Sequence, residues 1–147
     1  AIGGYNNTDG TALTGASYIG RRGWELTDGK NISIYGNFTV PSDFVSTMTV
    51  TPIVVTLSAG NVYAYNEAYY GAVGQSTATH NNVSAYAAVA VTGTVAYDEG
   101  HEALALSSVA AGDYVSLVYI RDAVSASDTV NNPMYFVGWL VSYTADS

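Results

Sequence analysis

Apolar and polar residues alternate along much of this chain with the two-residue period of a β-strand. The clearest case is residues 31–40 (NISIYGNFTV), in which every second residue is apolar or small. Residues 134–143 (MYFVGWLVSY) are rich in the residue types that strands favour, and strict alternation places Tyr135 and Trp139 on one face and Phe136 on the other. No convincing amphipathic helix is visible. The pattern therefore predicts an all-β protein.

Turn-forming residues divide the alternating pattern into about eight predicted strands: residues 18–26, 31–40, 45–57, 62–70, 84–95, 103–109, 114–120 and 134–143. Pro52 interrupts the third strand and has no N–H for a sheet, so we expect this strand to lie at an edge or to carry a bulge. Eight antiparallel strands in two packed sheets form a jelly roll. We predict a single antiparallel jelly-roll β-sandwich over residues 18–147.

Residues 1–17 (AIGGYNNTDGTALTGAS) are rich in Gly, Thr and Asn and have no sustained period. They predict an extended N-terminal arm ahead of the sandwich. Two interpretations of this arm stand, a frayed terminus and a tether to a neighbouring protein. Its uncharged, slightly apolar composition favours the tether.

The composition restricts the classes of partner. The 147 residues suit one domain with a hydrophobic core, and only 11% of them are charged, which suggests that much of the surface contacts another protein. The net charge of −8 argues against nucleic acid and against anionic membrane surfaces as partners. No apolar run reaches about 18 residues, so no membrane-spanning segment is predicted.

Residues suited to catalysis or metal binding are few. His80 and His101 lack the spacing of a zinc motif, the chain has no Cys, and the acidic turn 98–102 lacks the ligand spacing of a calcium loop. There is no GxSxG motif and no Gly-rich loop that opens a helix. Four carboxylates would support glycoside hydrolysis only if they converged in space: Glu25, Asp28, Asp43 and Glu67. We therefore predict no enzyme activity, no cofactor and no metal site.

Thirteen tyrosines are the strongest remaining signal. Seven of them are candidates for an aromatic interface: Tyr5, Tyr35, Tyr63, Tyr65, Tyr69, Tyr70 and Tyr86. Tyrosine suits interfaces because it buries a large area at low entropy cost and keeps a hydroxyl for hydrogen bonding. The alternative is that these rings fill the inner sheet faces with their hydroxyls at the rim. The scarcity of charged residues favours the interface.

Arg121 is one of four basic residues and ends an apolar strand. A guanidinium in that position needs a bidentate carboxylate partner, and both Asp122 and Asp128 lie within reach of the following loop. We interpret this group as a structural clamp between the last two strands.

Several segments together resemble jelly-roll virion proteins of tailed bacteriophages: residues 23–26 (GWEL), 36–44 (GNFTVPSDF), 112–115 (GDYV), 121–122 (RD), 128–129 (DT) and 138–143 (GWLVSY). The resemblance implies a small domain, often trimeric, on the outside of a virion, either as a head decoration (cement) protein or as part of a fibre or spike. It brings no catalytic residues. The absence of a shaft or coiled-coil segment departs from the fibre version.

The sequence thus favours a homotrimeric decoration protein that binds the major capsid protein at the virion surface. In this hypothesis the arm links neighbouring subunits, and many modest contacts add up through multivalency. Two alternatives remain. One is a carbohydrate-binding module of a tail fibre or spike, which would bind glycans through its tyrosines, and the other is a secreted, extracellular filament subunit.

Overall fold

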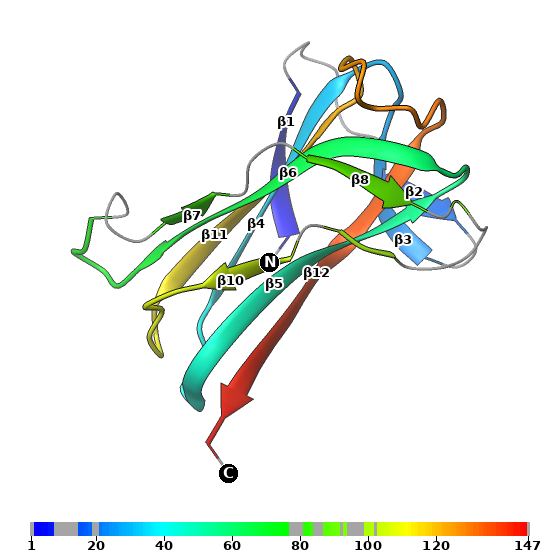
Figure 1. Ribbon diagram of the computed structural model, residues 1–147. Helices are drawn as coiled ribbons and strands as arrows, with labels where there is room; N and C mark the ends of the chain where they lie inside the picture. The colour runs from blue at the N-terminus through cyan, green and yellow to red at the C-terminus, as the bar shows by residue number, and fades with distance from the viewer. Residues whose placement is uncertain are drawn as a thin grey trace.

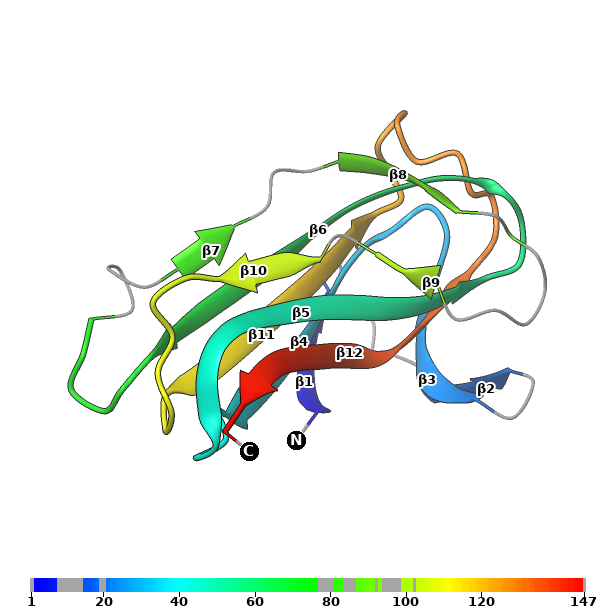
Figure 2. The same ribbon diagram turned by 60° about the horizontal axis from the view of Figure 1, so that its bottom comes forward.

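The computed structural model describes residues 2–7, 15–18, 21–76, 81–83, 87–91, 93, 99–101 and 103–146. In these residues the chain forms two antiparallel β-sheets that pack face to face as a sandwich (Figures 1 and 2). The predicted fold class is therefore confirmed. The described residues contain no helix that could span a membrane.

The first sheet contains, in spatial order, β1 (Ile2–Asn7), β4 (Asn31–Thr39), β11 (Tyr114–Asp122) and β6 (Gly60–Gly71), with β7 (Asn81–Val83) and β8 (Ala87–Val91) both paired to β6. The second sheet contains β2 (Gly15–Tyr18), β3 (Arg21–Leu26), β12 (Met134–Ala145), β5 (Phe44–Thr56) and β10 (Leu104–Leu106), with β9 (Glu99–Gly100) also paired to β5. The described residues thus hold twelve strands, more than the eight expected, because short strands such as β7 and β9 are too brief to show a period.

The hydrophobic core lies between the sheets in two clusters. One surrounds Ile34, Tyr119 and Phe136, and the other surrounds Val50 and Leu117. Trp139 packs against both clusters and so joins them. Burial of every second residue in β4, β6 and β11 follows the alternation that the sequence shows.

The sequence expectation for β12 fails at one point. Its register against β5 shifts between Phe136 and Gly138, which marks an irregularity of the β-bulge type. Phe136 is fully buried before the shift, and Trp139 packs on the core after it. Strict alternation would have placed these two residues on opposite faces, so the predicted shared face of Tyr135 and Trp139 is wrong.

Pro52 lies in an inner strand, not at a sheet edge. On the side of β5 away from β12, β10 pairs up to Val50 and β9 begins at Ile53, so Pro52 falls between two short partners. Its carbonyl accepts a hydrogen bond from His101 N at 2.9 Å. The sequence also allowed a bulge in the strand that contains Pro52. A bulge does occur, but it lies in the neighbouring strand β12, opposite Ile53 of β5.

The expected N-terminal arm is partly built into the sandwich. β1 pairs with β4 and places Tyr5 opposite Ile34, and β2 pairs with β3. Both strands lie at the ends of their sheets, where a segment without strong alternation can still pair through its backbone. The division of the chain at residue 17 stays a prediction.

Candidate functional site

The outer surface of the first sheet carries a group of tyrosines. Along β6, the inward residues from Val62 to Tyr70 are buried, so the residues between them project from the sandwich. The projecting side chains are Tyr63, Tyr65, Glu67 and Tyr69, as the alternation predicted, and each is half-buried. Tyr35 of β4 projects from the same surface, because its neighbours Ile34 and Gly36 are buried against the core.

The strand register arranges these side chains in rows across β4, β11 and β6. One row contains Tyr35, Val118 and Glu67. The adjacent row towards the β4–β5 turn contains Asn37, Ser116 and Tyr69, and the adjacent row on the other side contains Ser33, Ile120 and Tyr65. Neighbouring strands lie about 4.8 Å apart, so each row spans about 10 Å from β4 to β6. We call this surface of β4, β11 and β6 the tyrosine face.

Polar groups accompany the rings of the tyrosine face. The hydroxyl of Tyr69 donates a short hydrogen bond to Glu67 Oε1, which lies two residues earlier on the same side of β6. This hydrogen bond, with lesser effects of burial and of the Glu67 charge, raises the pKa of Tyr69. Asn37 and Ser116 add exposed amide and hydroxyl groups. The face thus offers flat apolar rings with hydrogen-bonding groups beside them.

Positive charge is located elsewhere in the molecule. Arg21 and Arg22 belong to β3 of the second sheet, Lys30 lies in the turn between β3 and β4, and Arg121 is buried. Glu67 and, at the end of β11, Asp122 therefore make the tyrosine face anionic, and the only basic residue on its three strands is the inward-pointing Arg121.

The seven tyrosines that the sequence proposed for an interface do not all lie together. Tyr35, Tyr63, Tyr65 and Tyr69 share the tyrosine face. Tyr70 is a correction, because it points inward, is 1% exposed and donates a hydrogen bond to the Ser107 carbonyl. Tyr70 thus follows the alternative interpretation of the tyrosines, in which their rings fill the inner faces of the sheets. The structure places the Tyr5 backbone in β1, and Tyr86 lies outside the described residues.

Sequence reasoning missed the contribution of β11 to this face. Tyr114 is 61% exposed at its end, opposite Thr39 of β4 and Gly71 of β6. Ser116 follows it on the same side. The alternation of residues 114–120 predicts that Tyr114 and Ser116 share one side of the strand. Only the strand order shows that β11 lies between β4 and β6.

Arg121 is fully buried at the other end of β11 and pairs with Asp128. Its Nε and Nη2 donate to the two oxygens of that carboxylate at 3.0 and 2.9 Å. Asp122, the other expected partner, does not take part, because adjacent residues of a strand point to opposite sides of the sheet. Asp28 lies further away, with its Oδ1 3.8 Å from Arg121 Nη2, and is 39% exposed.

The remaining Arg121 donors bind backbone carbonyls on separate segments. Nη1 donates to Leu26 O at 2.9 Å and to Asn132 O at 3.1 Å, and Nη2 donates to Val130 O at 2.6 Å. All five N–H groups of the guanidinium are therefore used. Leu26 ends β3 of the second sheet, so Arg121 connects both sheets to residues 123–133, the connection between β11 and β12.

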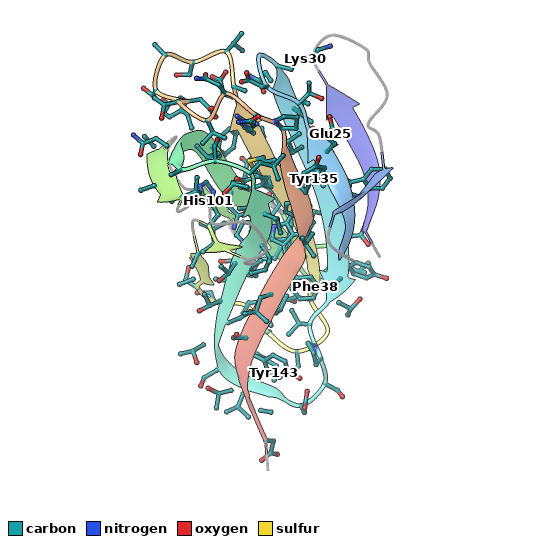
Figure 3. The ribbon with its side chains drawn as sticks, turned by 90° about the vertical axis from the view of Figure 1, so that its right-hand side faces the viewer. Glu25, Lys30, Phe38, His101, Tyr135 and Tyr143 are labelled. Carbon is teal, nitrogen blue, oxygen red and sulfur yellow. The ribbon has the colours of Figure 1, made fainter. Side chains whose placement is uncertain are left out.

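Among the described residues, the candidate catalytic carboxylates Glu25, Asp43 and Glu67 lie in separate parts of the sandwich. Glu67 lies on the first sheet, whereas Glu25 of β3 pairs with Tyr135 on the second sheet, at the opposite end of β12 from Tyr143 and its partner Asp43 (Figure 3). His101 is buried, and its Nδ1 lies 2.8 Å from the Tyr119 hydroxyl. His80 lies outside the described residues. Within the described ranges, no three His, Asp or Glu side chains are grouped to hold a metal ion.

The sequence matches no protein-family model and no curated protein. Solved structures do match the fold. TmCBM61, solved in complex with β-1,4-galactotriose, has a TM-score of 0.52 at 7% identity, and the alignment covers 95% of this chain and 87% of that one. TmCBM27, a carbohydrate-binding module studied for specific mannan recognition, has a TM-score of 0.42 at 11% identity over 98% of this chain and 86% of that one. The likeness to TmCBM61 shows a shared β-sandwich fold.

Proposed function

We propose that this protein is a non-catalytic carbohydrate-binding module and that the tyrosine face is its binding surface. The observation that carries the proposal is the set of half-buried tyrosines in adjacent rows of one outward-facing sheet surface, with amide, hydroxyl and carboxylate groups beside them. Ligand sites in proteins combine apolar and aromatic contact area with a few polar groups that fix orientation. A sugar ring has the matching chemistry, with apolar C–H surfaces and hydroxyls around its edge.

The structural comparison supports this proposal through the fold. TmCBM61 has the same β-sandwich architecture over most of this chain, and it was solved with a β-1,4-linked galactose oligomer. Proteins with the same fold have many different functions, so the functional assignment must rest on the residues of the site. The comparison therefore supports the carbohydrate-binding hypothesis better than the capsid-decoration hypothesis, and the homotrimer, the capsid partner and the virion or extracellular location stay predictions.

The charge of the face restricts the class of glycan. Its described charged side chains, Glu67 and Asp122, are both acidic, and the whole chain carries a net charge of −8. Glycans that carry carboxylate or sulfate groups would meet repulsion without a basic partner. We therefore propose neutral glycans as the ligand class.

Binding measurements on glycans would test the function. The intact protein is applied to a panel that contains β-1,4-galactotriose, other neutral oligosaccharides and polygalacturonate. The proposal predicts binding to at least one neutral glycan and none to polygalacturonate. For the neutral glycan that binds, Tyr35→Ala and Tyr69→Ala should each weaken affinity by about tenfold or more, which corresponds to about 1.4 kcal/mol per tenfold step.

Tyr135→Ala is the matched control, because Tyr135 is also a half-buried strand tyrosine but belongs to the second sheet. Its glycan affinity should equal that of the wild type. Absence of binding to every neutral glycan, or equal losses from Tyr135→Ala and Tyr69→Ala, would reject the tyrosine face as a carbohydrate site.

A further inference from the structure

Glu67 lies between the aromatic rings of the tyrosine face. Along β6, Tyr65 and Tyr69 flank it at two residues on either side, and Tyr35 belongs to its own row across β11. At about 3.4 Å per residue, the backbone positions of Tyr65 and Tyr69 are about 14 Å apart, with Glu67 about 7 Å from each. A pyranose ring is about as wide as a phenol ring, so a glycan that covers both tyrosines contains more than one sugar unit and passes over Glu67.

The side chain of Glu67 is part of a packed outer layer. Val118 lies between Tyr35 and Glu67 in their row and points outward, since its neighbours Leu117 and Tyr119 belong to the core. Val118 is nevertheless only 8% exposed, so side chains of the outer surface cover it. Glu67 itself is half-buried. A side chain that is already packed loses little conformational freedom when a ligand binds.

The hydrogen bond between Tyr69 and Glu67 determines what this part of the face can recognise. The Tyr69 hydroxyl donates its only proton to Glu67 Oε1, and this contact raises the pKa of Tyr69. A carboxylate has no proton to donate. The pair therefore presents acceptors to a ligand, Oε2 of Glu67 among them. A ligand group at this point must be a donor, as a free sugar hydroxyl is and as a methylated or acetylated one is not.

The charge of Glu67 strengthens its role as an acceptor. The strands β4, β6 and β11 contain one basic residue, Arg121, which points inward and pairs with Asp128, so no cation of these strands neutralises Glu67. Asp122, the other acidic residue of the face, lies four residues along β11 from the row of Glu67. A hydrogen bond to an ionised acceptor is about twice as strong as one between neutral groups.

We propose that Glu67 is the specificity-determining residue of the tyrosine face, where its carboxylate accepts a hydrogen bond from a hydroxyl of a neutral oligosaccharide stacked on Tyr65 and Tyr69. This inference rests on the proposed function and names its ligand class, oligosaccharides with a free hydroxyl above Glu67. A glycan that is substituted at this hydroxyl covers the carboxylate without pairing it. Sites built to hydrogen-bond a hydroxyl discriminate strongly against analogues that lack it, because the polar group of the protein is left unpaired.

The experiment is calorimetric titration of the intact protein with the neutral oligosaccharide of the panel that binds best, and with analogues that each lack one hydroxyl. Glu67→Gln keeps the shape of the side chain and removes its charge, and should weaken binding about tenfold. One analogue should lose about tenfold in affinity for the wild type but about threefold or less for Glu67→Gln, because the variant has already lost most of that hydrogen bond. A purely structural role of Glu67 would weaken all analogues by the same factor.

Glu25→Gln is the matched control, because Glu25 is also a half-buried strand carboxylate beside a tyrosine, Tyr135, but belongs to the second sheet. Its glycan affinity should equal that of the wild type. The monosaccharide unit of the same glycan should bind the wild type about tenfold more weakly or worse, because it buries apolar area on one ring only.

Equal binding by the wild type and Glu67→Gln would overturn the inference, and so would analogues that lose the same factor on both proteins. In both cases glycan binding by the tyrosine face would still stand. A monosaccharide that binds as well as the oligosaccharide would contradict the placement across Tyr65 and Tyr69. Absence of binding to every neutral glycan would reject the proposed function and this inference together.

Discussion

At the scale of single residues, Arg121 is one of the largest fully buried side chains that the structure describes. It is fully buried, uses all five of its N–H donors, and joins the end of β3, the 123–133 connection and Asp128. Asp128 accepts further hydrogen bonds from the backbone N–H groups of Tyr63 at 3.1 Å and Val130 at 3.2 Å. The pair therefore connects both sheets through one buried charge-assisted contact.

We predict that Arg121→Ala lowers the free energy of unfolding by about 3–5 kcal/mol, because it leaves Asp128 buried without its counter-charge. Urea denaturation measures the effect. Asp128→Asn and the double variant complete a double-mutant cycle, in which the sum of the two single losses should exceed the loss of the double variant, because each single substitution already removes the ion pair. An unchanged unfolding midpoint for Arg121→Ala would show that the ion pair does not stabilise the fold.

The same pair shows what the sequence reveals about single residues. An arginine at the end of an apolar strand predicts a carboxylate partner, and loop length allowed both Asp122 and Asp128. The choice between them depends on which side of β11 faces the core, and the backbone carbonyls of Leu26, Val130 and Asn132 come together only in three dimensions. Likewise, alternation puts Tyr69 and Tyr70 on opposite faces, but it does not say which face is inside.

Tyr69 gives a second prediction at this scale. Its pKa is raised above the ordinary value of 10.0, mainly because the protonated hydroxyl donates to Glu67. The stability from this contact is therefore present below about pH 10, the unfolded value, and is lost as the pH rises through the folded pKa. Glu67→Gln should lower the pKa of Tyr69, measured by NMR titration of the tyrosine ring carbons.

Asp43→Asn is the matched control for that titration. Asp43 accepts a hydrogen bond from the Tyr143 hydroxyl at 3.1 Å, and this contact raises the pKa of Tyr143. Asp43→Asn should lower the pKa of Tyr143 and leave Tyr69 unchanged. If Tyr69 titrated identically in the wild type and in Glu67→Gln, the hydrogen bond would not control its ionisation.

At the scale of elements, the contact between β4 and β12 depends on one glycine. A Cβ added at Gly36 would lie 2.5 Å from Trp139 Cζ3, so the indole ring packs directly on the β4 backbone. The Trp139 Nε1 also donates to Asn66 Oδ1 at 3.3 Å, which fixes the ring against β6. The two sheets therefore approach closely at this position because β4 has no side chain there.

Gly36→Ala should destabilise the protein by about 1–3 kcal/mol, the usual effect of overpacking a core, because Trp139 must move. Thermal and urea unfolding measure the loss. Gly15→Ala is the control, since an added Cβ there would meet only Trp24 Cζ3 at 3.9 Å, an ordinary contact. It should change stability by no more than about 0.5 kcal/mol. Equal effects of the two substitutions would contradict the close packing at Gly36.

The strands also show which structural features the alternation of apolar and polar residues can and cannot predict. The period of two located the long strands β4, β5, β6, β11 and β12, because burial of one sheet face imposes that period on the sequence. It could not reveal the register shift in β12, since one inserted residue changes the face of every later side chain without a sequence signal of its own. The alternation did not predict the edge strand β1 for another reason, because backbone pairing at a sheet edge requires little from the side chains.

At the scale of the whole molecule, the two sheets have different outer surfaces. The first sheet carries the tyrosine face with the acidic Glu67 and Asp122, whereas the C-terminal half of β12 in the second sheet, residues 138–145, contains no charged residue. The sequence predicted the sandwich and four of the face tyrosines, but the resemblance led to a capsid function that the comparisons do not support. The sequence pattern could not distinguish a protein interface from a carbohydrate-binding surface, because tyrosines in a chain with few charged residues suit both equally well.

The central claim, that the tyrosine face binds a neutral glycan, is tested most directly by NMR titration of the intact protein with the neutral oligosaccharide that binds best. We predict that backbone amide shifts change around Asn37, Ser116 and Tyr69, whose side chains form one row of the face, and that amides of β5 and β10 in the second sheet stay constant. Shift changes confined to the second sheet or to the connecting loops, or no changes with any neutral glycan, would contradict the account.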